Sequence, residues 1–478
     1  MNHHHHHCDA LIIGAGQAAP ALAVALAGFG EKVILVESNQ LGGTCVNVGC
    51  TPTKTLRKSA RVAYMARRGA EFGVNTGPIT IDFAKAMDRM QERVVASRGG
   101  LEGWLANTPN VTVLRGWGSL AGHTEQGFQA IVDINGESQH ITANGVYLNT
   151  GTRPFMPPIL GLASNDPRIL NNEGLLQLRE CPKHLFILGG SYIGLEFAQI
   201  FRRLGAEVTV IEPSSRIAMR EDEIVTHAIT EFLQEEGVQI LTGSTLEKVE
   251  SSAGGLTLHI KSGGVVQALE ASHLLVATGR LPNTERLNLA SIGLPTDSRG
   301  YVDVNGQLET SVPGVWALGD INKRGAFTHT SYHDFEIVRD NLHLAKQGAP
   351  LRSADDRTTA YAMFTDPPLG RVGFNRSAAK AEGERTGRQF LIAEHHMRFV
   401  SRAKEESETH GVIQFVVDAK TESFVGATVL GINGDEIIQV VSNYMATGAS
   451  YKLMRNCLPV HPTVTEFFPT ILDKLAAL

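Results

Sequence analysis

Hydrophobic residues near the start of the chain are grouped in a way that predicts a buried strand followed by a helix. Residues 11–16 (LIIGAG) form a short apolar run, and an alanine-rich run continues to Gly30. The twenty residues from Leu11 to Gly30 carry no charge, which is the length of a membrane span. Their glycines, Pro20 and Gln17 nevertheless favour a buried strand and helix over a signal peptide or anchor.

The strand, turn and helix, followed by a second strand at residues 32–37 (KVILVE), match a dinucleotide-binding fingerprint. Gly14 and Gly16 permit the tight turn that leaves a pyrophosphate on the helix N-terminus, and Ala19 takes the third glycine position. Glu37 ends the second strand and is expected to bind ribose hydroxyls. A ligand-free strand–helix–strand unit is the alternative.

Residues 184–212 repeat this pattern, so the chain is predicted to contain two dinucleotide-binding units. Gly189, Ser191 and Gly194 form the second turn, and Glu212 closes the following strand. Ser191 replaces the middle glycine and makes the backbone approach to a pyrophosphate more crowded.

Three later segments follow apolar runs. Residues 150–154 (TGTRP) and 277–283 (ATGRLPN) are interpreted as the ends of the two units. In GVWALGDIN the apolar run stops at Gly319 and Asp320, where an acid can hydrogen-bond a ribityl chain. A plain Gly-Asp turn is the alternative.

Beyond Ala349 the pattern changes to alternating strands (YAMFT, GVIQFVVDA, FVGATVLG) and two helices, with no nucleotide fingerprint. This region is predicted to be a separate α+β unit. The expected fold is α/β, with two Rossmann-like domains and an α+β C-terminal domain.

Composition supports a globular chain that binds small molecules. Of 478 residues, 42% are hydrophobic and 19% charged, and 49 are glycine. The net charge of −6 gives no electrostatic basis for binding nucleic acid or an anionic membrane. The run His3–His7 is interpreted as an expression tag.

Five unevenly spaced cysteines exclude a secreted disulfide scaffold, so we expect a reducing compartment, the cytoplasm. Cys45 and Cys50 lie five residues apart, with Pro52 just inside a predicted helix. A helix N-terminus lowers a thiol pKa, and the spacing permits a disulfide. Two inert buried cysteines are the alternative. No further Cys or His lies between Cys8 and His123, so no metal site is expected.

Taken together, GGTCVNVGC followed by PTK, the two dinucleotide motifs, ATGRLPN, the Gly-Asp pair and HPTVTE resemble the class I pyridine nucleotide–disulfide oxidoreductases. The resemblance spans nearly the whole chain. It implies FAD in the first unit, NADH or NADPH in the second, and a homodimer formed through the C-terminal domain.

The resemblance also implies roles for single residues. Cys50 is expected to lie against the flavin, and Cys45 to attack the substrate. Lys54 is expected to pair with Glu196 beside the flavin N5. Tyr192 matches an aromatic residue that covers the nicotinamide pocket, with simple core packing as the alternative.

His461 and Glu466 lie five residues apart in HPTVTEFF. A carboxylate can fix the imidazole tautomer and raise its basicity, which suits a proton shuttle for a thiol. Without the resemblance His461 would be interpreted as structural. With it, His461 is expected to serve the dithiol of the partner subunit, so the active sites are shared.

Arg57, Lys58 and Arg61 form a basic stripe on the helix after the cysteines. Such a stripe is usually a solvated face, and guidance of anionic substrates by Arg57 is the alternative.

The expected domains are an FAD-binding domain (8–158), an NAD(P)-binding domain (159–279), a central segment returning to the FAD domain (280–350) and a dimerisation domain (351–478). The expected site residues are, for catalysis, Cys45, Cys50, His461, Glu466, Lys54 and Glu196; for FAD, Gly14, Gly16, Ala19, Glu37, Gly43, Thr44, Lys54, Thr150, Gly151, Gly319 and Asp320; and for NAD(P), Gly189, Ser191, Tyr192, Gly194, Glu212 and Gly279.

The expected function is electron transfer from NAD(P)H through FAD and a Cys45–Cys50 disulfide to a small-molecule disulfide or related acceptor, as in dihydrolipoamide dehydrogenase. One alternative is a metal-ion or oxidant reductase resembling mercuric reductase. Another is a flavoprotein redox sensor without enzymatic activity. The acceptor itself stays open.

Overall fold

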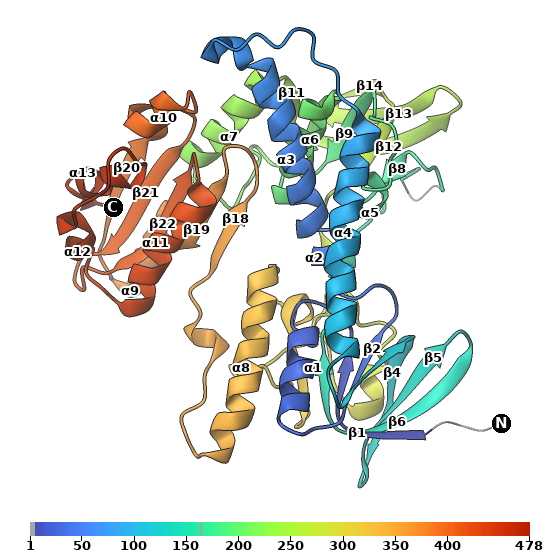
Figure 1. The fold of residues 1–478 in the computed structure, drawn as a ribbon. Helices are drawn as coiled ribbons and strands as arrows, with labels where there is room; N and C mark the ends of the chain where they lie inside the picture. Colours follow the sequence, from blue (N-terminus) through green and yellow to red (C-terminus); the bar gives the residue numbers. More distant parts are fainter. Residues whose placement is uncertain (1–4, 163–164) are drawn as a thin grey trace. The chain divides into compact units, whose positions relative to one another are not determined.

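The computed structural model describes residues 5–162 and 165–478, which divide into two compact units. The first unit contains the residues up to Thr55, Met87–Phe155 and Gly279–Arg357, and the second contains Leu56–Ala86, Met156–Thr278 and Thr358–Leu478. Both units combine helices with sheets (Figure 1). Each is built from three separate stretches of chain, so long-range contacts hold both together.

A seven-stranded sheet forms the centre of the first unit, in the order β3-β2-β1-β6-β5-β4, with β17 paired to β6. β1, β2, β3, β6 and β17 run parallel, whereas β4, β5 and β6 form an antiparallel meander. The strands are β1 (His5–Ile13), β2 (Val33–Glu37), β3 (Val111–Arg115), β4 (Trp117–Thr124), β5 (Gly127–Ile134), β6 (Glu137–Leu148) and β17 (Val315–Ala317).

The structure extends β1 into the histidine run, because His5 and His7 pair with His140 and Thr142 of β6. Strand pairing uses backbone groups and does not depend on the side chain. These histidines therefore join the sheet although the sequence alone suggests an expression tag. The remaining histidines of that run, His3 and His4, lie outside the described residues.

Helices cover the sheet of the first unit. Leu22 and Leu26 of α1 (Ala19–Gly28) share a buried cluster with Phe335 and Val338 of α8 (Thr328–Lys346). The predicted strand and helix between Leu11 and Gly30 are therefore confirmed as β1 and α1. The other helices that contribute to this unit are α2 (Gly43–Asn47), the start of α3 (Cys50–Arg67) and most of α4 (Phe83–Ala106).

The second dinucleotide pattern forms a five-stranded parallel sheet in the second unit, in the order β11-β10-β9-β15-β8. An antiparallel sheet of β12, β13 and β14 follows it. The bounds are β8 (Ile169–Leu170), α5 (Asn172–Leu175), β9 (His184–Leu188), α6 (Tyr192–Leu204), β10 (Glu207–Glu212), α7 (Glu223–Glu235), β11 (Val238–Thr242), β12 (Ser244–Ser252), β13 (Gly255–Ser262), β14 (Val265–Ala271) and β15 (His273–Val276).

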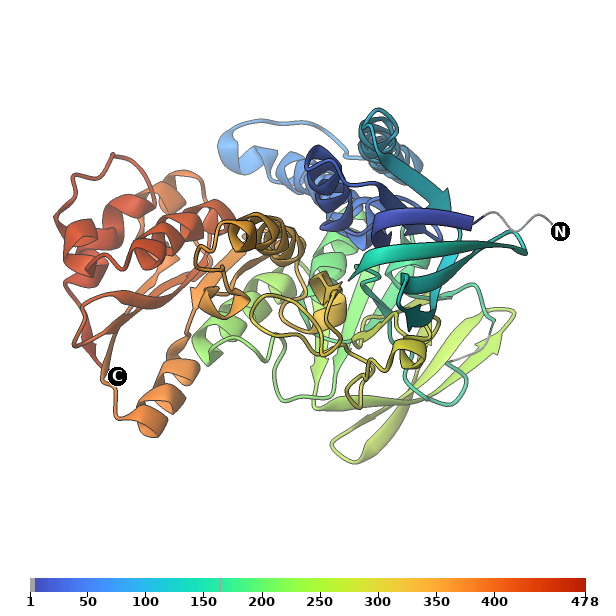
Figure 2. The ribbon, with the colours of Figure 1, turned by 90° about the horizontal axis from the view of Figure 1, so that it is seen from below.

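The C-terminal region adds a six-stranded antiparallel sheet to the second unit, with helices along it (Figure 2). Five helices accompany it where two were predicted, because α10, α12 and α13 are too short to show a helical hydrophobic period. Along the chain the elements are β18 (Ala360–Met363), β19 (Leu369–Gly373), α9 (Arg376–Thr386), β20 (Phe390–His396), α10 (Ser401–Glu405), β21 (Val412–Asp418), β22 (Phe424–Leu430), α11 (Gly434–Thr447), α12 (Tyr451–Asn456), α13 (Phe468–Leu472) and β23 (Ala476–Ala477).

The two segments interpreted as unit ends pair with each other. β7 (Thr152–Pro154) and β16 (Arg280–Pro282) form a two-stranded antiparallel sheet in the first unit. The predicted fold class is confirmed: two Rossmann-like units are followed by an α+β C-terminal region. Among residues 5–162 and 165–478, no helix combines the length and apolarity needed to cross a membrane.

Candidate active site

A carboxylate holds the first glycine turn in place through hydrogen bonds from the backbone. Gly14 has φ +93°, and a Cβ there would lie 2.5 Å from the carbonyl oxygen of Asn149. Glu37 accepts hydrogen bonds from the backbone N–H groups of Ala15 and Asn39, both at 2.7 Å. Each carboxylate oxygen keeps a lone pair for a further donor such as a ribose hydroxyl.

The second turn has the same construction. Gly189 has φ +115°, and Glu212 accepts from the backbone N–H groups of Gly190 and Ser214, both at 2.8 Å. A Cβ on Gly194 would lie 2.1 Å from the carbonyl oxygen of Gly189, so only glycine allows this helix to approach the turn. Ser191 is the residue directly before α6, and its side chain makes no hydrogen bond that caps this helix.

Polar groups of the first unit form a hydrogen-bonded cluster around Thr152. Asp320 accepts a hydrogen bond from the hydroxyl of Thr152 at 3.1 Å, and burial raises the pKa of its carboxyl group. Arg280 donates to the carbonyl oxygen of Thr152 at 2.6 Å and to the hydroxyl of Thr44 at 3.3 Å. Gly43 packs its backbone near Gly16, where a Cβ on Gly43 would lie 3.0 Å from the Gly16 Cα.

These residues fit a bound flavin dinucleotide. The turn at Gly14 leads into the N-terminus of α1, where a pyrophosphate would be bound, Glu37 would offer acceptors to a ribose, and Asp320 would offer a half-buried acceptor to a ribityl chain. Thr150 and Gly151 also hold the segment after β16, because the Thr150 hydroxyl donates to the carbonyl oxygen of Asn283 at 2.9 Å and the Gly151 carbonyl oxygen accepts from the Asn283 N–H at 3.0 Å, and their contact with FAD stays a prediction. Gly279 accepts from Phe155 in the same connection.

The cysteine pair lies at the junction of α2 and α3. Cys45 is in α2 and Cys50 opens α3, as predicted from the helix start. Both are free thiols, joined by a hydrogen bond. Gly49 makes the tight turn between them, because a Cβ there would lie 2.8 Å from the carbonyl oxygen of Thr44.

The Cys45 thiol differs from the expectation of a lowered pKa. Its pKa is raised, first by the hydrogen bond to Cys50 and then by burial, while Thr328 and the charge of Lys54 act in the opposite direction. The pair therefore retains a proton that must be removed before Cys45 can act as a nucleophile.

Thr328 is a site residue that sequence reasoning missed. Its hydroxyl lies 3.3 Å from the Cys50 sulfur, and it is the first residue of α8. It is 278 positions from Cys50 in the sequence and stands in no motif, so no local signal identifies it.

His461 and Glu466 are brought together as predicted from HPTVTE. The imidazole Nδ1 lies 2.7 Å from Glu466 Oε2, and the His461 side chain is 75% exposed while Glu466 is 14% exposed. The neighbouring apolar side chains of Leu458 and Val460 are also exposed, at 96% and 74%. The carboxylate orients an imidazole whose reactive nitrogen is open to another molecule.

Glu196 is held by the C-terminal region. Its Oε1 accepts the backbone N–H of Phe364 at 2.8 Å. Gln199, one turn further along α6, exchanges two hydrogen bonds with the backbone of Asp366, both at 2.7 Å. Arg203 pairs with the Asp366 side chain. Glu196, Gln199 and Arg203 thus form one polar face of α6, which we call the α6 polar face. Lys54 belongs to the first unit and Glu196 to the second, and their pairing stays a prediction.

Two of the three residues in the basic stripe after the cysteines are bonded to residues 365 and 366 of the C-terminal region. Arg57 donates twice to the carbonyl oxygen of Thr365, at 2.8 and 3.1 Å, and Arg61 pairs with Asp366 at 3.0 Å. Burial opposes ionisation of Asp366, but Arg203, Arg61 and Arg57 together lower its pKa. The solvated-face interpretation is therefore wrong for Arg57 and Arg61, whereas Lys58 is exposed.

Comparison with known proteins agrees with this geometry. Residues 8–334 match the pyridine nucleotide-disulphide oxidoreductase family, and residues 359–471 match the dimerisation domain of that family. The chain is 34% identical over 467 residues to the probable pyridine nucleotide-disulfide oxidoreductase RclA of Escherichia coli, covering 96% of this chain and 97% of that protein.

Two further relatives are informative. The mercuric reductase of Staphylococcus aureus is 32% identical over 473 residues, covering 98% of this chain and 82% of that protein. A solved structure, the Cu(II) complex of the HOCl-induced flavoprotein disulfide reductase RclA from Escherichia coli, superposes with a TM-score of 0.86 at 32% identity, covering 99% of each chain. This chain therefore belongs to the pyridine nucleotide–disulfide oxidoreductase family and is a flavin-dependent oxidoreductase of that family.

Proposed function

We propose that this protein passes electrons from a nicotinamide nucleotide, through FAD and a Cys45–Cys50 disulfide, to a small-molecule disulfide. The hydrogen-bonded pair of Cys45 and Cys50, beside Thr328 and the charge of Lys54, is the observation that carries the proposal. Bound FAD supplies the chemistry that accepts a hydride from the nicotinamide and delivers two electrons to the cysteine disulfide.

The dithiol then reduces the acceptor by two exchange steps. Cys45 loses its proton and attacks one sulfur of the acceptor disulfide, forming a mixed disulfide and releasing one thiol. Cys50 next attacks the Cys45 sulfur, which releases the second thiol and restores the Cys45–Cys50 disulfide. The two electrons of the dithiol thus leave with the acceptor, and its two protons end on the released thiols.

His461 is proposed as the base for Cys45. Because the pKa of Cys45 is raised, a neutral imidazole oriented by Glu466 is suited to take its proton and return it to the leaving thiol. The exposed His461, the exposed Leu458 and Val460 beside it, and the matching dimerisation domain support a homodimer in which His461 serves the dithiol of the partner subunit.

A metal-ion or oxidant reductase is the second candidate function. A relative of known structure, RclA, is described as HOCl-induced and was solved with Cu(II), and another relative is a mercuric reductase. A pair of thiols is a soft donor set that binds Cu or Hg ions. The same Cys45–Cys50 pair would then deliver electrons to a bound oxidised metal.

The proposed function is tested by turnover of the purified, FAD-loaded protein with a panel of acceptors. Each reaction contains NADH or NADPH with one acceptor: lipoamide, glutathione disulfide, a small aromatic disulfide, Cu(II) or Hg(II). We expect steady oxidation of the nucleotide with at least one disulfide. Sustained turnover with metal ions alone would favour the second candidate, and oxidation of one equivalent without turnover would identify a redox sensor.

We expect this enzyme to prefer NADH over NADPH. Glu212 is fixed by two backbone N–H groups at the end of β10, where its charge accepts hydrogen bonds from a ribose diol and repels a 2′-phosphate. The measurement compares kcat/KM for the two nucleotides in the wild type and in Glu212→Gln. Glu212→Gln should narrow the preference, and a larger kcat/KM with NADPH in the wild type would contradict this assignment.

A further inference from the structure

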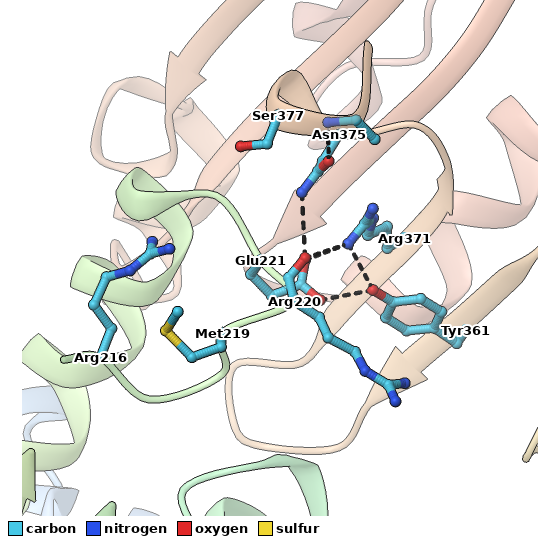
Figure 3. Close-up of a pocket in the computed structure, with 9 residues that line it drawn as sticks. Arg216, Met219, Arg220, Glu221, Tyr361, Arg371, Asn375 and Ser377 are labelled. Atoms are coloured by element: carbon cyan, nitrogen blue, oxygen red, sulfur yellow. Dashed lines mark hydrogen bonds and ion pairs between the residues drawn. The ribbon is translucent and has the colours of Figure 1, made fainter. Parts of the chain in front are cut away.

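A buried carboxylate next to the second glycine turn is hydrogen-bonded to two tyrosines and an arginine. The side chain of Glu221 has no exposed surface. Its Oε1 accepts from the hydroxyl of Tyr192 at 2.5 Å and from that of Tyr361 at 2.7 Å. Arg371 lies 3.3 Å from its Oε2 and also donates to the Tyr361 hydroxyl at 2.8 Å. Glu221, Tyr361 and Arg371 form part of the wall of a cavity of about 530 Å³ (Figure 3).

The side chains that contact the Glu221 carboxylate come from two different parts of the second unit. Tyr192 is the first residue of α6 and directly follows the glycine turn of the dinucleotide-binding pattern. Tyr361 and Arg371 lie on β18 and β19 of the C-terminal sheet. The rings of Tyr192 and Tyr361 are 5.5 Å apart and tilted by 38°. Tyr192 is therefore held by the hydrogen bond from its hydroxyl to Glu221 and by the contact of its ring with that of Tyr361.

These contacts leave Tyr192 little freedom. Burial, and then the charge of Glu221, raise the pKa of the Tyr192 phenol, so the hydroxyl stays protonated and donates to the carboxylate. The pKa of Tyr361 is raised for the same two reasons. Hydrogen bonds to a charged acceptor are about twice as strong as neutral ones, and a buried carboxylate that lost such a donor would remain unsatisfied.

We propose that Glu221 is a positioning residue that fixes the Tyr192 ring as a rigid wall of the nicotinamide-binding site. The proposal rests on the proposed function, because it requires a nicotinamide nucleotide at the turn before α6. A flat aromatic ring held in place offers a nicotinamide ring a stacking surface without the entropy cost of ordering it on binding. Through Tyr361 and Arg371, the C-terminal sheet would contribute to nucleotide affinity by holding Glu221 in place.

The neighbouring residue provides a matched control. Asp222 accepts from the backbone N–H groups of Arg376 at 2.8 Å and Ser377 at 3.2 Å, and from the Ser377 hydroxyl at 2.9 Å. It therefore caps α9 and also joins the nucleotide-binding part to the C-terminal region. Its contacts lie on α9, whereas those of Glu221 include Tyr192. Asp222→Asn should weaken the structure without releasing the ring.

The test compares the FAD-loaded wild type with Tyr192→Phe, Glu221→Gln, Tyr361→Phe and Asp222→Asn. Calorimetry measures the Kd of NAD⁺ and of ADP-ribose, which lacks the nicotinamide ring. We expect Tyr192→Phe and Glu221→Gln to weaken NAD⁺ binding about tenfold, because the freed ring must then be ordered on binding, while leaving ADP-ribose binding within twofold. Tyr361→Phe should weaken NAD⁺ binding less. Asp222→Asn should lower the melting temperature without changing either Kd.

Tyr192→Phe keeps the proposal testable if Glu221→Gln fails to fold, because it removes one oxygen and retains the ring. NAD⁺ binding by Tyr192→Phe that matches the wild type would overturn the proposal, as would an equal loss of ADP-ribose binding. If the wild type binds NAD⁺ and its flavin is reduced by NADH, those results reject the positioning role alone. If the wild type binds neither NAD⁺ nor NADP⁺ and its flavin resists reduction by both reduced nucleotides, the proposed function and the positioning role both fail.

Discussion

Replacing His461 by alanine is expected to slow reduction of a disulfide acceptor by roughly 10²–10⁴-fold, which is the usual contribution of a positioned general base. The reason is the raised pKa of Cys45, which leaves few thiolates without a base. Reduction of the flavin by the nicotinamide nucleotide should be unchanged, since that step requires no proton from the dithiol. Rapid-mixing absorbance measurements separate the two half-reactions. His396→Ala, at an exposed histidine at the end of β20 in the C-terminal region, is the matched control.

Mixed dimers test whether the site is shared. A Cys45→Ser chain and a His461→Ala chain, carrying different affinity tags, are refolded together and the heterodimer is purified through both tags. Each homodimer is nearly inactive, whereas the heterodimer should keep one intact site, formed by Cys45 of one chain and His461 of the other. Verified heterodimers without activity would mean that His461 serves its own chain or is not the base.

Replacing Cys45 by serine is expected to abolish acceptor reduction and to leave a long-wavelength charge-transfer band without any reductant. With its hydrogen-bonding partner removed, Cys50 cannot form a disulfide, and its thiolate would lie against the flavin. Cys50→Ser should also be inactive but should lack the band. An absorbance spectrum of each oxidised variant provides the measurement.

Two controls complete this comparison. Two-electron reduction of the wild type should produce the same band. Cys181→Ser, which removes a partly buried cysteine of the second unit, should behave like the wild type. A band in Cys50→Ser but not in Cys45→Ser would exchange the two roles. A wild type with no band at any stage of reduction would count against the pairing of thiol and flavin.

The sequence predicts those parts of the site that are local. The turns at Gly14 and Gly189 are predictable because glycine, helix start and strand-ending acid lie within about 25 residues, a spacing that the dinucleotide fold imposes. Cys45 with Cys50 and His461 with Glu466 are likewise five residues apart in each case, so one turn of chain brings each pair together.

Residues that act across long separations in sequence leave no such pattern. Thr328 approaches Cys50 across 278 positions, and Tyr361 approaches Glu221 across 140. Arg57 looks like part of a solvated stripe until the fold brings Thr365 and Asp366 against it. Helical spacing specifies which side of a helix a residue occupies, but tertiary packing decides what that side faces.

The α6 polar face limits how far this enzyme can be treated as a set of exchangeable modules. Gln199 and Arg203 are matched to the backbone and carboxylate of Asp366, which lies in the C-terminal region beyond the nucleotide-binding stretch. A chimera that imported residues 156–278 from a relative would bury Asp366 against an unfamiliar helix, and an unmatched buried charge is strongly destabilising. To change the nucleotide specificity by exchanging α6, residues 364–367 must therefore be exchanged together with that helix.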